Sequence, residues 1–157
     1  MASAGATFPI DVGSADGQHF LIVESRHDAD RADELLEGAS EALAAAQASF
    51  DVVSVPGVLE IPAAIAMALE AGDYDGFIAL GNVVHNQPAH LGHIVPEVTR
   101  ALLELSVVDA LPLGNGLVAT ETESEARGQT APSGRNVGGT AARAALAMAA
   151  LKLKLNA

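Results

Sequence analysis

The stretch YDGFIALGNVV, residues 74–84, is apolar over almost its whole length. A strand with one face in water alternates apolar and polar residues, whereas a nearly continuous apolar strand is buried on both faces. Strands of the second kind occur in parallel sheets that helices cover on both sides. Residues 74–84 therefore predict a strand of such a sheet.

The chain before this strand alternates between strand and helix patterns. HFLIVES (19–25) is a short apolar run rich in strand-forming residues, and residues 28–47 follow it with a capping Asp and helical spacing of apolar residues. SFDVVSVPG (49–57) predicts a second strand that ends at Pro-Gly. Residues 59–74 then predict a helix, which tolerates Pro62 in its first turn.

The same alternation continues after residue 84. Residues 89–110 predict a helix and LPLGNGLVATE (111–121) a fourth strand. A short helix around ESEARGQ (123–129), a loop over residues 130–139 and a last helix over residues 140–156 complete the chain.

Four strands that alternate with helices predict a three-layer α/β/α sandwich with a four-stranded parallel sheet and flavodoxin-like winding. Residues 1–18 are rich in Gly, Ser and Ala and predict a flexible N-terminal arm, so residues 19–157 form a single domain. Ligands of such folds bind outside the carboxyl ends of the strands. On topology alone, we expect the site to draw on His27, Leu59, Glu60, residues 85–90 and Asn115 or its neighbours.

Composition excludes several classes of protein. The 157 residues carry a net charge of −12, which argues against binding to nucleic acid or to an anionic membrane. The chain has no cysteine, so it has neither disulfides nor thiolate metal ligands. No apolar run has membrane-spanning length, and the first 18 residues lack the features of a signal peptide. We expect a soluble cytoplasmic protein.

Three of the five histidines, His85, His90 and His93, fall close together after the apolar strand. One interpretation is a metal site, although no acid stands at ligand spacing between His90 and His93. The other is a set of polar residues at the edge of the sheet.

The residues GNGLVA (114–119) match the consensus of a dinucleotide-binding motif. They lie at the start of a predicted strand, however, whereas that motif joins the end of a strand to a helix.

Four segments together resemble lumazine synthase, an enzyme of riboflavin biosynthesis: LIVESRHDADRADELLEGASEAL, FDVVSVPGVLEIPAAIAMAL, YDGFIALGNVV and VGGTAARAALAMAALK. The resemblance covers residues 19–152, and VPGVLEIP matches a motif specific to that family. It implies condensation of 5-amino-6-(D-ribitylamino)uracil with 3,4-dihydroxy-2-butanone 4-phosphate to 6,7-dimethyl-8-ribityllumazine. It implies neither a metal nor an organic cofactor. It also implies small-molecule substrates and self-association into pentamers, which in some members form decamers or 60-subunit shells.

The resemblance assigns roles residue by residue. In PAHLGHIV, His90 stands at the position of the catalytic acid–base histidine. His27 takes the place of an aromatic residue that stacks on the pyrimidine, and Asn115 would come from a neighbouring subunit. The remaining substrate-binding positions are Val58, Leu59 and Glu60 for the ribityl chain, and Asn82, Val83 and Val84 for the pyrimidine.

The phosphate-binding positions depart from the family pattern. His85 stands where an arginine is expected, and Gln87 and Pro88 follow in place of the usual loop residues. Gln129 also replaces an arginine, although Arg127 and Arg135 lie nearby in the sequence. One hypothesis is a working lumazine synthase with a rebuilt phosphate site. The other is an impaired or engineered relative that keeps the fold as a pentameric or shell scaffold, or binds a flavin-like ligand.

Overall fold

The computed structural model describes residues 12–84 and 93–157. Four parallel strands form one sheet in the order β2-β1-β3-β4, so the chain reverses its direction of growth between β2 and β3. This is the winding that the sequence predicts. The strands are β1 (His19–Ser25), β2 (Ser49–Val55), β3 (Gly76–Val84) and β4 (Leu113–Thr120).

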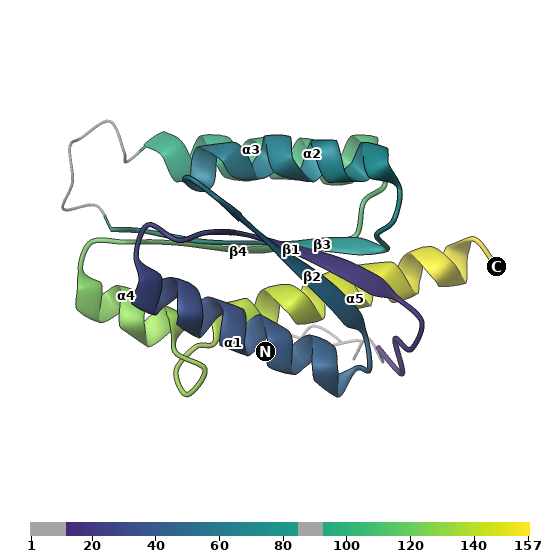
Figure 1. The fold of residues 1–157 in the computed structure, drawn as a ribbon, viewed down its shortest axis with the longest axis horizontal. Coiled ribbons are helices and arrows are strands. Elements are labelled where there is room, and N and C mark those ends of the chain that lie inside the picture. Colours follow the sequence, from purple (N-terminus) through teal and green to yellow (C-terminus); the bar gives the residue numbers. More distant parts are fainter. Residues whose placement is uncertain (1–11, 85–92) are drawn as a thin grey trace, which may run out of the picture.

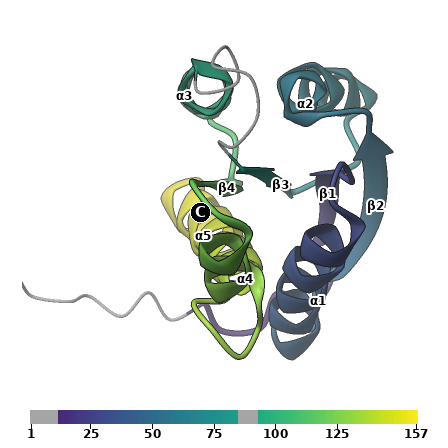
Figure 2. The ribbon, with the colours of Figure 1, turned by 90° about the vertical axis from the view of Figure 1, so that its left-hand side faces the viewer.

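Helices cover both faces of the sheet, which confirms the three-layer sandwich (Figure 1). α2 and α3 lie on one face, whereas α1, α4 and α5 lie on the other, as the turned view also shows (Figure 2). The helical elements are α1 (Ala29–Ala45), the 3-10 turn η1 (Val58–Glu60), α2 (Ile61–Ala71), α3 (Ile94–Val108), α4 (Glu123–Thr130) and α5 (Val137–Leu155).

Polar caps decide where three of the helices begin. Oδ1 of Asp28 accepts a hydrogen bond from the Arg31 amide at 3.2 Å and starts α1. Thr122 caps α4 in the same way. Oδ1 of Asn136 accepts from the Gly139 amide, and this cap starts α5 at Val137. The prediction that the last helix begins at residue 140 was therefore wrong, because the Asn cap extends the helix through Gly138 and Gly139.

Proline and glycine shorten other predicted elements. β2 ends at Val55 and not at Gly57, because Pro56 has no N–H for the ladder. α2 ends at Ala71 and not at residue 74, because Gly72 adopts a left-handed conformation with φ of 80°. The predicted helix over residues 59–74 also opens with the separate turn η1, and β3 begins at Gly76.

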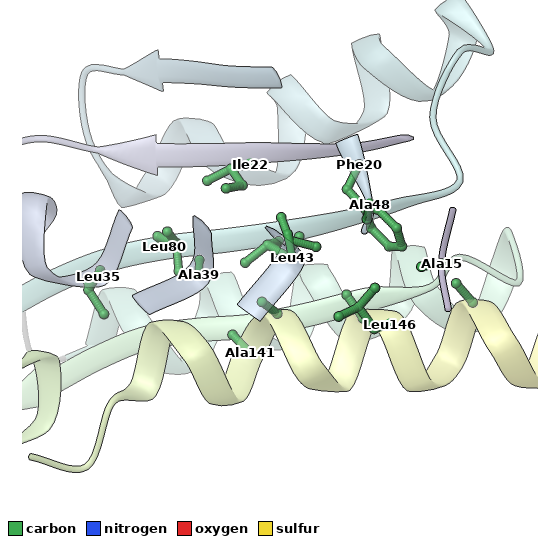
Figure 3. Close-up of a cluster of buried hydrophobic side chains, with 14 of the residues drawn as sticks. Ala15, Phe20, Ile22, Leu35, Ala39, Leu43, Ala48, Leu80, Ala141 and Leu146 are labelled. Atoms are coloured by element: carbon green, nitrogen blue, oxygen red, sulfur yellow. The ribbon is translucent and has the colours of Figure 1, made fainter. Parts of the chain in front are cut away.

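Two hydrophobic cores lie between the layers, one on each face of the sheet. Between the sheet and the pair α1 and α5, Phe20, Ile22 and Leu80 pack against Leu43 and Leu146, with small alanines filling the space between the helices (Figure 3). On the opposite face, α2 and α3 close over a second core, which comprises Leu21, Val23, Val58, Ile61, Ile65, Phe77, Ala79, Val98, Leu102 and Leu111. Successive residues of β1 enter opposite cores, as its continuous apolar sequence requires.

Residues 12–18, which the sequence analysis assigns to the N-terminal arm, contact the end of α1. Ala15 is buried in the α1–α5 core, and its amide donates to the carbonyl of Ala46 at 2.8 Å. None of the helices in the described part of the chain is long and apolar enough to cross a membrane.

Candidate functional site

A pocket of about 230 Å³ opens at the carboxyl ends of the strands, where the winding places ligands. Four segments that are far apart in the sequence line it: the end of β1, the turn after β2, the end of β3 and the start of α3. The lining residues are Ser25, His27, Pro56, Gly57, Val58, Leu59, Glu60, Asn82, Val83, Val84 and Ile94.

The turn after β2 forms one wall of the pocket. Val58 is buried beneath it, while Leu59 and Glu60 are exposed. A Cβ on Gly81 would lie 2.6 Å from Cγ1 of Val58, so only glycine at this position of β3 lets the turn approach the sheet so closely. The first amide groups of a helical turn have no partner inside the helix, so this wall presents donors to a ligand.

The end of β3 forms the floor of the pocket. Val83 is half-buried, whereas Asn82 and Val84 are each 8 % exposed. In the described part of the chain, Oδ1 of Asn82 has no hydrogen-bond partner. β3 pairs with β4 as far as Val84 but with β1 only as far as Leu80, so beyond Leu80 the backbone groups on the β1 side can form hydrogen bonds with a ligand.

The segment after β1 brings His27 to the pocket mouth, where its side chain is exposed. Its neighbour Arg26 is held on both sides by acids: Nη1 donates to Glu24 at 3.0 Å, and Nη2 donates to Asp33. Hydrogen bonds to Asp33 and then to Glu24 raise the pKa of Arg26 above its ordinary value. Glu60 is the acidic lining residue, and its Oε2 lies 3.2 Å from the point where a Cβ on Gly57 would stand.

The pocket is mostly apolar and carries a few polar groups: the Glu60 carboxylate, the His27 imidazole and the amides of the turn, together with the side chains of Ser25 and Asn82. Such an arrangement suits a small planar ligand that carries a polar chain. Among residues 12–84 and 93–157, no three His, Asp or Glu side chains gather as a metal-binding group.

The structure brings most of the predicted substrate-binding residues together. His27, Val58, Leu59, Glu60, Asn82, Val83 and Val84 all line the one pocket. Asn115 does not: it lies near the start of β4 beside Ala79, exposed, with Oδ1 accepting from the Leu117 amide at 3.0 Å. Gln129 lies on α4 and does not line the pocket either. His90, Gln87 and Pro88, together with His85, lie outside the described residues.

Four lining residues were not predicted: Ser25, Pro56, Gly57 and Ile94. Pro56 and Gly57 belong to the VPGVLEIP motif, and Ser25 directly precedes the Arg26–His27 pair, so their position beside predicted residues was an available signal. Ile94 belongs to the PAHLGHIV segment that carries His90, and it enters the pocket through the packing of α3 over the sheet.

Comparison with known proteins identifies the family of the chain. The profile of the 6,7-dimethyl-8-ribityllumazine synthase family matches residues 17–153. The chain is 50% identical to the 6,7-dimethyl-8-ribityllumazine synthase of Agrobacterium fabrum over 142 residues, which cover 87% of this chain and 96% of the relative. It is 48% identical to 6,7-dimethyl-8-ribityllumazine synthase 1 of Rhizobium meliloti, over 88% of this chain and 94% of the relative. The chain belongs to the 6,7-dimethyl-8-ribityllumazine synthase family.

Proposed function

We propose that the protein condenses 5-amino-6-(D-ribitylamino)uracil with 3,4-dihydroxy-2-butanone 4-phosphate to 6,7-dimethyl-8-ribityllumazine, releasing phosphate and water. The family membership supports this reaction. The observation that carries the proposal is the single pocket at the carboxyl edge, in which the residues expected to hold the ribityl chain and the pyrimidine lie together.

The pyrimidine substrate fits the polarity of this pocket. Its ribityl hydroxyls would receive hydrogen bonds from the amides of Val58 and Leu59 and donate to the Glu60 carboxylate. Its ring would lie on the strand end formed by Asn82, Val83 and Val84, with the His27 imidazole against one face.

The chemistry gains most from holding two reactants together. Imine formation, loss of phosphate and ring closure all require defined contact between the two substrates, and such positioning contributes up to about 7–11 kcal/mol in ideal cases. His90, at the family position of the catalytic histidine, would transfer protons near neutral pH.

The phosphate site is rebuilt in this chain. Gln87, Pro88 and Gln129 stand at the family's phosphate-binding positions without offering a cation. Arg127 on α4 and Arg135 before α5 are exposed and free to supply positive charge to a phosphate at a neighbouring pocket. Each charge-assisted hydrogen bond would contribute on the order of 1.5–3 kcal/mol.

Assembly belongs to this proposal. Asn115 lies outside its own pocket on an exposed part of β4, where it is accessible to a second copy. Large apolar side chains are exposed on β2, α3 and α5, including Val52, Leu103, Val107 and Leu155. Of these, Val107 and Leu155 line one hollow between α3 and α5, and apolar surface of this kind marks association between chains. We propose pentamers in which one copy completes the pocket of the next.

A two-substrate assay tests the function directly. Purified protein is mixed with both substrates, and the fluorescent lumazine product is followed over time. We expect a rate well above the uncatalysed condensation. A rate equal to that background would contradict the proposal and favour the scaffold or ligand-binding hypothesis. Inorganic phosphate should also raise the unfolding temperature, because a ligand that binds only the folded state stabilises it.

The His90→Ala variant separates the contributions of proximity and proton transfer. We expect its kcat to fall by no more than roughly 100-fold, the lower end of what a general acid–base group contributes. Complete loss of activity in a variant that still assembles would contradict the view that proximity dominates.

A further inference from the structure

The side chains of the segment Glu24–His27 point alternately to two sides of the sheet, and only those on one side line the pocket. Phe20 and Ile22 of β1 enter the core on the α1 side of the sheet, so Glu24 shares that side. Ser25 faces the other way, since a Cβ on Gly81 would lie 3.0 Å from its Oγ. Ser25 and His27 line the pocket, and the residues alternating with them, Glu24 and Arg26, do not.

Glu24 and Arg26 form a hydrogen-bonded network with two other elements. The Glu24 side chain is only 3 % exposed, and both of its oxygens accept from Nη1 of Arg26, at 3.0 and 3.2 Å. Ser54 of β2 donates its Oγ proton to Oε1 of Glu24 at 3.1 Å. Nη2 of Arg26 donates to Asp33, which lies on α1. We call Ser54, Glu24, Arg26 and Asp33 the Arg26 clamp.

A buried carboxylate is stable only when it is paired, so Glu24 requires Arg26 in this place. The planar guanidinium has a fixed fork of donors and therefore restricts the direction of its own backbone. On the other side of His27, Asp28 is fixed as the cap of α1. The two chain neighbours of His27 are thus both anchored, and the backbone from which the imidazole projects is held between them.

Arg26 is not available as an anion-binding residue. Two carboxylates already pair with its guanidinium, and together they carry more negative charge than the arginine neutralises. Its contribution to the site must therefore be geometric.

We propose that Arg26 is a positioning residue, which through the clamp holds His27 against the ring of the pyrimidine substrate. This inference rests on the proposed lumazine synthase reaction. It assigns the clamp to the pyrimidine alone, because the butanone phosphate has no ring to stack and its phosphate is held elsewhere.

The test compares Arg26→Met, Arg26→Lys and Asp33→Asn with the unmodified protein in the two-substrate assay. We expect Arg26→Met to raise KM for the pyrimidine about tenfold, while KM for the butanone phosphate stays within about twofold. Arg26→Lys should recover part of this loss, since lysine keeps the charge but not the fork. Asp33→Asn should raise the same KM by about two- to threefold. Arg100→Met is the control, because within the described part of the chain Arg100 pairs only with exposed Glu97 and Glu104 on α3.

Hydrogen exchange of the amides of residues 26–28 gives a second readout. It should accelerate in the three clamp variants and not in Arg100→Met. Arg26→Met leaves Glu24 buried without its partner and can fail to fold, in which case Asp33→Asn decides, because Asp33 is exposed and its loss leaves the Glu24–Arg26 pair in place.

Three results would overturn the inference. One is an unchanged pyrimidine KM in Asp33→Asn and Arg26→Lys, and another is an equal rise of both KM values. The third is a fall in kcat while both KM values stay unchanged. Failure of the proposed function gives a different result: the unmodified protein itself then makes lumazine no faster than the background. In that case the clamp has no substrate to position, and both proposals are wrong.

Discussion

Glu60 precedes the first residue of α2, with its side chain exposed at the rim of the pocket. A carboxylate at the start of a helix is favoured by the helix dipole whether or not it binds a ligand. The residue can therefore have a structural role, a binding role or both. A substitution that removes the charge and keeps the shape separates the two.

We expect Glu60→Gln to raise KM for the pyrimidine substrate by about three- to tenfold, because a neutral amide accepts weaker hydrogen bonds from the ribityl hydroxyls. The matched control is Glu70→Gln, at the other end of the same helix and away from the pocket. Steady-state kinetics with each substrate varied in turn give the measurement. An equal effect of both substitutions on KM would show that the Glu60 carboxylate does not bind substrate.

The sequence predicted the residues that line the pocket well where they belong to a recognisable motif. The resemblance of the VPGVLEIP segment named Val58, Leu59 and Glu60 as binding positions, and the pocket contains all three. No pattern in the sequence indicates the Arg26 clamp. Its members come from β1, β2 and α1 and from the segment after β1. Only the packing of these elements brings Ser54 to the Glu24 carboxylate and Asp33 to the Arg26 guanidinium.

Among the elements, α1 and α5 depend on glycine for their close packing. A Cβ on Gly138 would collide with the carbonyl oxygen of Leu35 in α1. Gly128, in the short helix α4, has nothing within 4 Å of the position its Cβ would take. The two glycines therefore differ in what an added methyl group would meet.

Alanine substitutions at these glycines should change stability in opposite directions. Gly138→Ala should lower the free energy of unfolding by about 1–3 kcal/mol, because the helices must move apart. Gly128→Ala should raise it by about 0.5–1 kcal/mol, because glycine in a helix interior costs backbone entropy. Chemical denaturation of both variants gives the comparison. Equal destabilisation by both would contradict the packing geometry.

A cluster of polar side chains links β1 and β2 to the residue Tyr74 before β3, near the amino ends of the strands. Nε2 of His19 lies 2.9 Å from Oδ2 of Asp51, and the Tyr74 hydroxyl donates to the same oxygen at 2.9 Å. The rings of His19 and Tyr74 also stack, with centroids 5.2 Å apart. Hydrogen bonds from His19 and then from Tyr74 lower the pKa of Asp51, and the bond to Asp51 raises the pKa of Tyr74.

These shifts predict the pH dependence of a Tyr74→Phe variant. A lowered carboxyl pKa contributes stability above the unfolded value of about 4, and this contribution is lost as the pH falls through the folded pKa of Asp51. A raised phenol pKa contributes stability below about pH 10, and this is lost as the pH rises through the folded pKa of Tyr74. The stability difference between the unmodified protein and Tyr74→Phe should therefore be largest near neutral pH and shrink at both extremes. Denaturation across pH 3–11 measures it, and a difference that grows toward low pH would contradict the assigned bonds.

For the whole molecule, the distribution of exposed apolar side chains points to self-association. Leu103, Val107 and Val108 on α3 are 62 to 75 % exposed, on the helix that covers one face of the sheet (Figure 1). Leu153 and Leu155 near the end of α5 are also exposed, and Leu155 lines the same hollow as Val107. A monomer in water would leave these surfaces uncovered.

We expect the double variant Leu103→Glu with Val107→Glu to have a lower mass by analytical sedimentation than the unmodified protein. The two residues share one face of α3, and burying two carboxylates in an apolar interface is strongly unfavourable. If a neighbouring copy supplies Asn115, activity should fall together with assembly. The control is Glu104→Gln on the same helix, where loss of an exposed ion pair costs little. Unchanged mass in the double variant would exclude this face of α3 from the interface.

The order of strands and helices, the parallel sheet and the edge at which the pocket lies could all be predicted from the sequence. Those features depend on local periodicity, caps and the winding rules of α/β proteins, all of which can be read along the chain. The tertiary structure decided which polar side chains meet: it placed His27 and Glu60 in one pocket, locked Arg26 between two acids and left Asn115 outside. These contacts join residues from different elements, and their geometry follows from how the layers pack and not from any pattern within a single segment.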